Sequence, residues 1–433
     1  MHTQVAQPRV KASPAVDSIV IVHPTGNEFS RNAALAFHEN GILNEFWTSI
    51  AWNSRSRLAP FIPRSMRAQL ERRSFSSQYD TKLKTHPWRE LGRLLSAKLK
   101  LTRLTTHERG IFSVDSVYRN LDSHVAQQIA QRSDINAIYA YEDGALSLFQ
   151  AAKRAGQKCI YDLPIGYWRA ARKIQQEEAQ LQPEWAPTLS ANLDSPQKLD
   201  RKDQELQLAN KIIVASTFTW KTLSLTPSVT APIQIVPYGA PQVSAPRARP
   251  HTGPLRVLFT GILGQRKGVS YLFDAVNRMG KEVELTLIGQ PAAKCPALDR
   301  ELSKHRWIRT LPHSQVLAEM DRHDVLVFPS LFEGFGLVIL EAMARGMAVI
   351  TTPHTAGPDL IADGTDGYVV PIRSSDAIVE KLEMLNRDRT LLHTVGEAAR
   401  KKADANNWRN YRKALVAAVT NTPDTDASTE SES

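Results

Sequence analysis

The chain has 433 residues, 42% of them hydrophobic, which is enough for two domains that each bury a core of their own. Its two cysteines, Cys159 and Cys295, lack metal-binding or redox spacing, and residues 1–17 lack the apolar core of a signal peptide. Because no run of about eighteen apolar residues occurs either, the sequence predicts a cytoplasmic protein with no membrane-spanning helix and a disordered N-terminus at residues 1–17.

The first predicted elements are a strand at Ser18–Val22, a turn at residues 23–27 and a helix from about Ser30 to Glu39, with Ser30 as its cap. A strand, a glycine turn and a helix in that order begin a doubly wound parallel sheet, in which ligands bind beyond the carboxyl ends of the strands.

Residues 55–109 hold fourteen Lys or Arg and four acids, so this one segment has the charge excess of the whole chain, +10. From Trp88 to Leu104 apolar residues recur at three- and four-residue steps between basic ones, which predicts a basic amphipathic helix. Such a helix either docks on an anionic membrane surface or packs on the domain core and leaves a solvated basic face. Nucleic acid is not an expected partner, because no nucleic-acid-binding motif accompanies the charge.

Further strands are predicted at residues 137–140 and 159–163, and Arg169–Gln182 has the charged, glutamine-rich pattern of a surface helix. The loops that follow the two strands bring in three carboxylates, those of Glu142, Asp143 and Asp162. Each of them is a candidate base for a substrate hydroxyl, and the competing interpretation, which the sequence favours, is that each caps its own loop.

A stretch rich in proline and small residues, 241–254, has the composition of a linker. Beyond it a strand at 255–259 leads into the loop Thr260–Gly268 (TGILGQRKG), a helix at 269–279 and a strand at 283–288. Arg266 and Lys267 lie in this glycine-bracketed loop. They either offer fixed positive charge to an anionic ligand such as a diphosphate or are two exposed basic residues.

The most informative stretch is Ser330–Ile350, where a glycine loop joins a strand at 325–328 to a helix at 337–345. Glu333 lies in the loop and Glu341 about one turn into the helix. A pair of carboxylates is typical of glycoside hydrolases, but one loop position and one helix position favour contacts with two different parts of a long ligand. A capped helix with two solvated glutamates is the alternative.

Two motifs together, TGILGQRKG at 260–268 and EGFGLVILE at 333–341, resemble the retaining GT-B glycosyltransferases of family 4, the glycosyl transferases group 1. The similarity extends over most of residues 255–371. It implies an α/β protein of two Rossmann-like, doubly wound domains that face a cleft. The implied parts are an N-terminal acceptor domain (18–240), the linker (241–254), a nucleotide-sugar donor domain (255–405), a crossover helix (406–420) and a disordered acidic tail (421–433).

The resemblance also implies a reaction, the transfer of a sugar with retention of configuration from a nucleotide diphosphate to an acceptor hydroxyl on a sugar, lipid-linked or polysaccharide precursor. Arg266 and Lys267 would neutralise the leaving diphosphate, and Glu333 and Glu341 would contact the donor sugar and the ribose. Other donor-binding positions would be Gly26, Gly334, Phe335, Gly336 and Leu337. No metal or other cofactor is expected, because the one Asp-x-Asp sequence, Asp424–Asp426, lies in the tail.

The first domain departs from the family pattern, in which many members have a histidine after the strand at 159–163. Asp162 stands there instead and is the candidate catalytic base. Two rival functions remain. One is a sugar-phosphate synthase-like enzyme on the same fold, and the other is a non-enzymatic scaffold whose basic segment binds the inner face of the membrane. The intact set of Arg266, Lys267, Glu333 and Glu341 argues against the scaffold.

Overall fold

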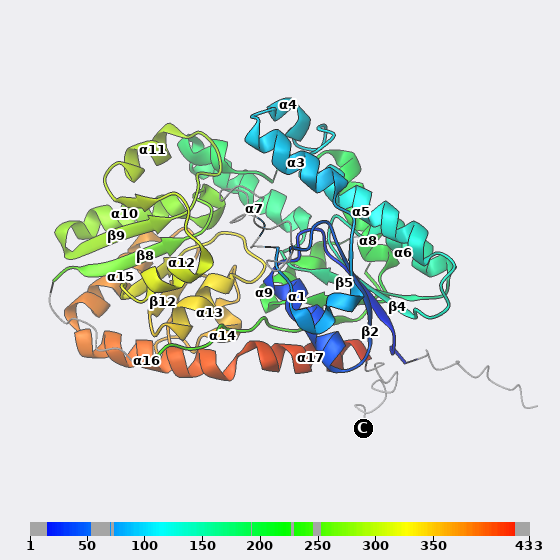
Figure 1. Cartoon of the computed structure of the whole chain (residues 1–433). Coiled ribbons are helices and arrows are strands. Elements are labelled where there is room, and N and C mark those ends of the chain that lie inside the picture. Colours follow the sequence, from blue (N-terminus) through cyan, green and yellow to red (C-terminus); the bar gives the residue numbers. More distant parts are fainter. Residues whose placement is uncertain are drawn as a thin grey trace, which may run out of the picture.

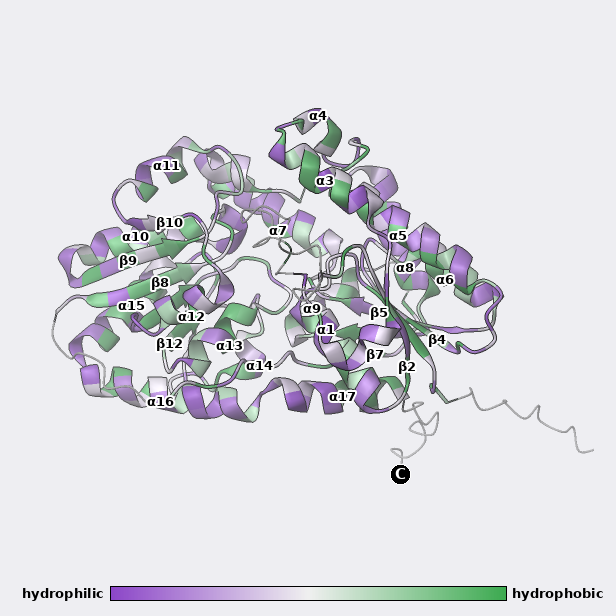
Figure 2. Cartoon of the chain, in the orientation of Figure 1, coloured by the Kyte–Doolittle hydropathy of each residue, from purple (hydrophilic) through white to green (hydrophobic). Residues whose placement is uncertain are grey.

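The computed structural model describes residues 15–52, 70, 73–191, 193–226, 229–245 and 253–420, and it contains two parallel sheets with helices packed around each (Figure 1). Apolar strands such as VLVF at 325–328 are buried along their whole length, as parallel sheets covered on both faces require. In Figure 2 the strands are mostly hydrophobic, whereas the surrounding helices are mixed. The predicted α/β fold of two Rossmann-like domains is confirmed.

The first sheet has seven parallel strands in the order β3-β2-β1-β4-β5-β6-β7. They are β1 (Ile19–Val22), β2 (Leu43–Thr48), β3 (Leu83–Thr85), β4 (Ala137–Tyr141), β5 (Lys158–Leu163), β6 (Lys211–Val214) and β7 (Ile233–Ile235). The helices of this domain include α1 (Glu28–Glu39), α5 (Val114–Ile129), α6 (Leu146–Arg154), α8 (Pro196–Leu208) and α9 (Thr217–Thr222). The strand order reverses between β1 and β4, which is where doubly wound sheets bind ligands.

The second sheet has six parallel strands in the order β10-β9-β8-β11-β12-β13 and reverses between β8 and β11. Its strands are β8 (Leu255–Thr260), β9 (Val283–Ile288), β10 (Arg306–Ile308), β11 (Val325–Phe328), β12 (Ala348–Thr351) and β13 (Tyr368–Val369). Its helices include α10 (Val269–Met279), α11 (Pro296–Leu302), α12 (His313–Met320), α13 (Leu337–Ala344), α14 (Gly357–Leu360), α15 (Ser375–Arg387) and α16 (Arg389–Ala405). The two predicted motif loops follow β8 and β11, so both begin at the reversal point of this sheet.

An arm of the first domain, α7 (Trp168–Leu181) and the 3-10 helix η3 (Pro183–Thr188), packs against the second domain (Figure 1). The rings of Trp185 and Phe273 stack with centroids 5.9 Å apart. Glu178 of α7 is fully buried. The prediction of a surface helix at 169–182 is therefore wrong in its environment, because one side of α7 is buried at the contact between the domains.

The last helix, α17 (Trp408–Thr420), leaves the second domain and packs on α1 of the first (Figure 1). Its buried side is formed by Tyr411, Leu415 and Val419. Arg412 Nε lies 2.9 Å from Glu39 Oε2. The chain thus crosses between the domains twice, once near residues 241–254 and once between α16 and α17.

Three local predictions are wrong. Helix α1 begins at Glu28 rather than Ser30, because the side chain of Asn27 caps it by accepting a 3.1 Å hydrogen bond from Ser30 N. The single helix predicted from Trp88 to Leu104 is broken into α3 (Trp88–Lys98) and α4 (Thr102–Thr105), with Lys100 at φ +56° between them. Val16 is already buried in the core, so the ordered domain begins before Ser18.

Within the described ranges, no helix is both long enough and apolar enough to cross a membrane. Several sequence predictions fall on residues outside those ranges. They concern most of the N-terminal segment, the part of the basic segment at 55–69, the centre of the linker at 246–252 and the acidic tail at 421–433.

Candidate functional site

The loop after β8 and the loop after β11 interlock. The 3-10 turn η5 (Gln265–Lys267) ends at Gly268, whose φ is +69° and where a Cβ atom would lie 2.1 Å from the carbonyl oxygen of Pro329. Only glycine combines that backbone conformation with such a close approach. Leu331 N donates a 2.9 Å hydrogen bond to the carbonyl of Arg266, and Arg266 NH1 donates one of 2.7 Å to Phe332 O.

This interlocking brings three of the predicted residues together. Lys267 Nζ forms an ion pair with the carboxylate of Glu333, and Arg266 NH1 lies 3.5 Å from the same carboxylate. Burial lowers the pKa of Arg266 to about 10, which leaves it charged at neutral pH. Burial, assisted by Arg266, also lowers the pKa of Lys267, whereas its contact with Glu333 favours the ammonium form. The result is a largely buried group of two cations and one carboxylate.

A pocket of about 730 Å³ opens beside these residues at the carboxyl ends of β8 and β9. Arg266 and Lys267 line one part of it, and Gly289 and Arg309 line another. Thr188, from the arm of the first domain, also lines the pocket, so both domains contribute to its wall. A pocket with several cations in its wall, among mixed apolar and polar groups, suits a long ligand with an anionic group.

The glycine loop before α13 contacts the first domain directly. A Cβ atom at Gly334 would lie 1.8 Å from the carbonyl oxygen of Pro164, and the Gly334 carbonyl accepts a 3.0 Å hydrogen bond from Thr219 Oγ1. Gly336 has φ +85° and immediately precedes Leu337, the first residue of α13. Ile339 N donates a 2.9 Å hydrogen bond to Gly336 O, and the N–H groups of Leu337 and Val338, which have no partner within the helix, could meet an oxygen-rich ligand.

Glu341 belongs to a second cluster, which joins the domains at α1, α12 and α13. His313 Nε2 lies 2.9 Å from Glu341 Oε1, and the contact raises the pKa of His313. Glu28, in the first turn of α1, is close enough for its carboxylate to join the same group, and burial together with Glu341 raises its pKa. Glu341 thus lies at the contact between the domains rather than on an open surface.

Two predicted site residues lie apart from these clusters. Gly26 has φ +56° in its turn, and a Cβ atom there would lie 2.2 Å from the ring of Phe75, so its missing side chain makes room for that ring. Asp162 is 1% exposed and accepts a 2.6 Å hydrogen bond from Tyr139 OH. Burial raises its pKa to about 7. The structure does not bring Asp162 together with Arg266, Lys267 or Glu333.

Three polar residues at the site were not found in the sequence, namely Glu28, His313 and Glu178. Glu178 accepts hydrogen bonds from Gln265 and Tyr271 and pairs with Arg373. Each of the three owes its position to contacts between elements far apart in the chain, and none lies in a recognisable motif. Within the described residues, Glu28–His313–Glu341 and His107–Glu108–Asp194 have the spacing of metal ligands.

Comparison with known structures identifies the fold. Sucrose-phosphate synthase from Thermosynechococcus elongatus superposes with a TM-score of 0.63 at 16% identity, over 92% of this chain and 97% of the other. Anabaena HepE, solved in complex with UDP and glucose, superposes with a TM-score of 0.59 at 14% identity, over 92% and 98%. The chain therefore has the GT-B fold of glycosyltransferases.

Sequence comparison finds a family match over the second domain. Residues 245–402 match the family described as Glycosyl transferases group 1. Glycogen synthase of Mycobacterium tuberculosis (strain ATCC 25618 / H37Rv) is 28% identical over 178 residues, 39% of this chain and 43% of that protein. CapM, a capsular polysaccharide biosynthesis glycosyltransferase of Staphylococcus aureus, is 30% identical over 153 residues, 34% and 40%. The family match is thus confined to residues 245–402, and the chain spans less than half the length of each of these relatives.

Proposed function

We propose that the protein is a glycosyltransferase that moves a sugar from a nucleotide diphosphate donor to an acceptor hydroxyl. The observation that carries the proposal is the meeting of Arg266, Lys267 and Glu333 beside the 730 Å³ pocket at the reversal point of the second sheet. The group 1 match covers all three residues. HepE, which shares the fold, was solved in complex with UDP-glucose.

Arg266 and Lys267 have the properties that departure of a diphosphate requires. Negative charge grows on the phosphate oxygen as its bond to the sugar breaks, and cations held in a partly dehydrated site stabilise that charge strongly. Both side chains are largely buried, and hydrogen bonding to Phe332 O fixes Arg266. The diphosphate would replace Glu333 as the partner of Lys267, and the freed carboxylate would accept hydrogen bonds from the donor sugar.

The helix α13 would hold the other parts of the donor. Its first N–H groups, after Phe335 and Gly336, would orient sugar and phosphate, and Gly334 leaves room for the chain of the first domain above the loop. Glu341 would accept hydrogen bonds from the ribose hydroxyls, which requires that it exchange part of its contact with His313. This exchange would couple donor binding to the contact between the domains.

We further infer that transfer retains the configuration at the anomeric carbon and needs no metal. Retention rests on the likeness of the loop at 333–341 to the retaining members of the family. Metal independence rests on Arg266 and Lys267, because two fixed cations supply the charge that a divalent ion would otherwise provide. The anomeric proton signal of the product, followed by NMR as it forms, tests retention, and turnover in EDTA tests metal independence.

The acceptor would bind on the side of the first domain, as a sugar or a lipid-linked or polysaccharide precursor. Asp162 is the candidate base from the sequence, but its enclosed carboxylate argues against that role. A sugar-phosphate synthase would share the donor site and differ only in its acceptor, so sugar phosphates belong in the acceptor panel.

The experiment measures nucleotide release from UDP-, GDP- and ADP-sugars, with and without EDTA, for the wild type, Glu333→Gln and Glu341→Gln. The expected result is release from one donor by the wild type, with a large loss of release in both variants. The donor that is used then identifies the nucleotide base that the site binds. Glu319→Gln is the matched control, because Glu319 pairs with Arg306 and Arg322 away from the pocket. Absence of both release and nucleotide binding in the wild type would contradict the proposal and favour the scaffold.

A further inference from the structure

The helix α3 has its polar and apolar sides reversed. Toward the domain it buries Glu90 and Ser96, and Glu90 is paired there with Arg73 and Arg93. Toward solvent it presents Trp88, which is 72% exposed, and Leu95, which is 56% exposed. A helix that only covered a core would turn its leucines inward. The buried ion pairs fix α3 in an orientation that leaves its apolar side uncovered.

The exposed apolar residues gather on α3 and in the segments next to it. From Trp88 to Leu99 they recur at the three- and four-residue steps that align side chains along a helix, and Leu101 and Ile111 lie just before α4 and in the loop after it. We call these residues the α3–α4 patch: Trp88, Leu91, Leu95, Leu99, Leu101 and Ile111. Large apolar side chains gathered in this way mark an interaction surface.

The exposed charges along the patch are mainly positive. Four exposed basic residues lie between and beside the apolar ones, namely Lys98, Lys100, Arg103 and Arg109. Of the two acids of the same region, Glu90 is buried and paired with Arg73 and Arg93, and Glu108 is turned to the domain, where it accepts a 2.8 Å hydrogen bond from Ser195 N. The partner of this patch must therefore accept an apolar stripe and supply negative charge.

We propose that the α3–α4 patch docks this protein on an anionic phospholipid surface. Trp and Leu side chains enter the boundary between headgroups and acyl chains, while Lys and Arg pair with the phosphates above it. Nucleic acid would satisfy the charges but leave the leucine stripe in water. A second copy of the patch would satisfy the leucines but bring like charges together.

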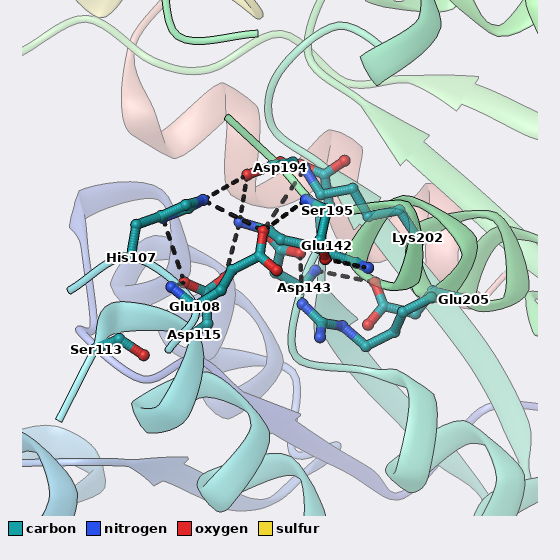
Figure 3. A network of polar contacts seen from close by, with 12 residues as sticks. His107, Glu108, Ser113, Asp115, Glu142, Asp143, Asp194, Ser195, Lys202 and Glu205 are labelled. Atoms are coloured by element: carbon teal, nitrogen blue, oxygen red, sulfur yellow. Dashed lines mark hydrogen bonds and ion pairs between the residues drawn. The ribbon is translucent and has the colours of Figure 1, made fainter. Parts of the chain in front are cut away.

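The patch is tied to the sheet of the first domain by a network of polar contacts (Figure 3). His107 Nε2, next to α4, lies 2.9 Å from Asp194, which Lys198 joins at 3.0 Å. Lys198 lies 2.8 Å from Asp115, at the start of α5. Arg201 holds Asp143, in the loop after β4, at 3.0 Å. The patch is thereby fixed relative to the carboxyl edge of the sheet, where the proposed acceptor would bind.

Docking would therefore hold the acceptor side of the protein at the lipid surface. This consequence for orientation rests on the proposed function, whereas lipid binding itself does not. Binding to vesicles is measured without donor or acceptor, which distinguishes the docking proposal from the proposed function. A protein with no transferase activity would still bind in this assay. Failure of binding with intact donor turnover would overturn the docking proposal alone.

The test is cosedimentation of the full chain with phosphatidylcholine vesicles that contain or lack phosphatidylglycerol, over a range of salt concentrations. Wild type should bind the anionic vesicles, and salt should weaken the binding. Trp88→Ser/Leu95→Ser and Lys98→Glu/Lys100→Glu should each lower the binding constant by about tenfold or more. Trp220→Ser and Lys401→Glu change exposed residues on α9 and α16 and should bind like wild type.

Three outcomes would overturn the proposal. One is equal binding to both kinds of vesicle, and another is binding that none of the patch variants weakens. The third is self-association of the wild type that the Trp88→Ser/Leu95→Ser variant abolishes, seen by sedimentation velocity without lipid, because a second copy would then cover the patch. Unchanged thermal melting of the variants shows that loss of binding does not result from unfolding.

Discussion

The carboxylate of Glu178, in α7 of the first domain, accepts a 2.7 Å hydrogen bond from Gln265 Nε2, in the loop that carries the two cations of the second domain. The same carboxylate accepts a 2.8 Å hydrogen bond from Tyr271 OH and lies 2.7 Å from Arg373 Nε. Glu178 is fully buried, and Gln265 is buried with it. A carboxylate from one domain therefore holds the side chain of Gln265, next to Arg266 and Lys267 in the other.

Replacing Glu178 by Ala should be strongly destabilising. The variant leaves Arg373 without its buried partner, and breaking a buried ion pair costs about 3–5 kcal/mol of the free energy of unfolding. Glu177→Ala is the matched control. Glu177 is the preceding residue, it also contacts Arg373, and it is half exposed, so its loss should cost less than about 1 kcal/mol. Thermal unfolding followed by circular dichroism distinguishes the two, and equal melting temperatures would contradict the role of Glu178.

Asp162→Asn should gain stability relative to wild type as the pH rises. The folded chain keeps the Asp162 proton up to a pKa of about 7, whereas the ordinary value is 3.8. The stability that Asp162 contributes is therefore fully present below 3.8 and is lost as the pH rises through 7. Because Asn does not ionise, the difference in melting temperature between variant and wild type should increase from about pH 5 to about pH 8.

The same variant tests whether Asp162 is a catalytic base. Because its side chain is enclosed, Asp162→Asn should keep kcat within about threefold of wild type. Loss of a general base would instead lower kcat by about 10²–10⁴-fold. A loss of that size with unchanged melting curves would instead assign the base to Asp162. Turnover is measured at saturating donor and acceptor, so that changes in binding do not enter.

Local sequence signals predicted the second domain well. The helix at 269–279 and the strand at 283–288 have the predicted bounds, because apolar runs between glycines define them without help from the rest of the chain. Arg266, Lys267 and Glu333 could be proposed together only because two short motifs resemble a family. Their contact itself depends on how the loops after β8 and β11 interlock.

Contacts between distant elements could not be predicted in the same way. From the sequence, Glu178 is indistinguishable from an exposed glutamate of a charged helix. Its burial becomes evident only when α7 is seen to pack against η5. Glu28 and His313 are far apart in the sequence, and only the approach of the domains brings them to Glu341. No glycine or proline marks the break at Lys100. The apolar periodicity therefore predicted a single helix that continues past the true end of α3.

The contact of His313 with Glu341 should stabilise the fold more at low pH. Hydrogen bonding to Glu341 and the nearby charges of Glu341 and Glu28 raise the pKa of His313, opposed by burial and Arg345. The contribution is therefore fully present below the ordinary value of 6.5 and is lost as the pH rises through the folded pKa. The melting temperature of wild type should exceed that of His313→Gln at about pH 5.5 and approach it by about pH 8.5. A difference that does not change with pH would show that the imidazole is not charged in this contact.

Leu415→Ala should weaken the attachment of α17 to the first domain. Leu415 is fully buried, and removing a buried leucine side chain costs about 2–5 kcal/mol. Limited proteolysis should then cut between α16 and α17 faster than in wild type. Val416→Ala, next to it and only partly buried, is the control that should show little change. Equal cleavage of both variants would mean that α17 does not depend on this contact.

The most direct test of the proposed donor site is kcat for nucleotide release by Arg266→Ala and Lys267→Met, with Lys401→Met, an exposed lysine of α16, as control. If the two cations stabilise the leaving diphosphate, each variant should lose about 10²–10³ in kcat, while the control keeps the wild-type rate. Nucleotide binding, measured by calorimetry, should remain detectable in at least one of the variants. Wild-type turnover in both Arg266→Ala and Lys267→Met would show that the diphosphate leaves elsewhere, and the proposed site would be wrong.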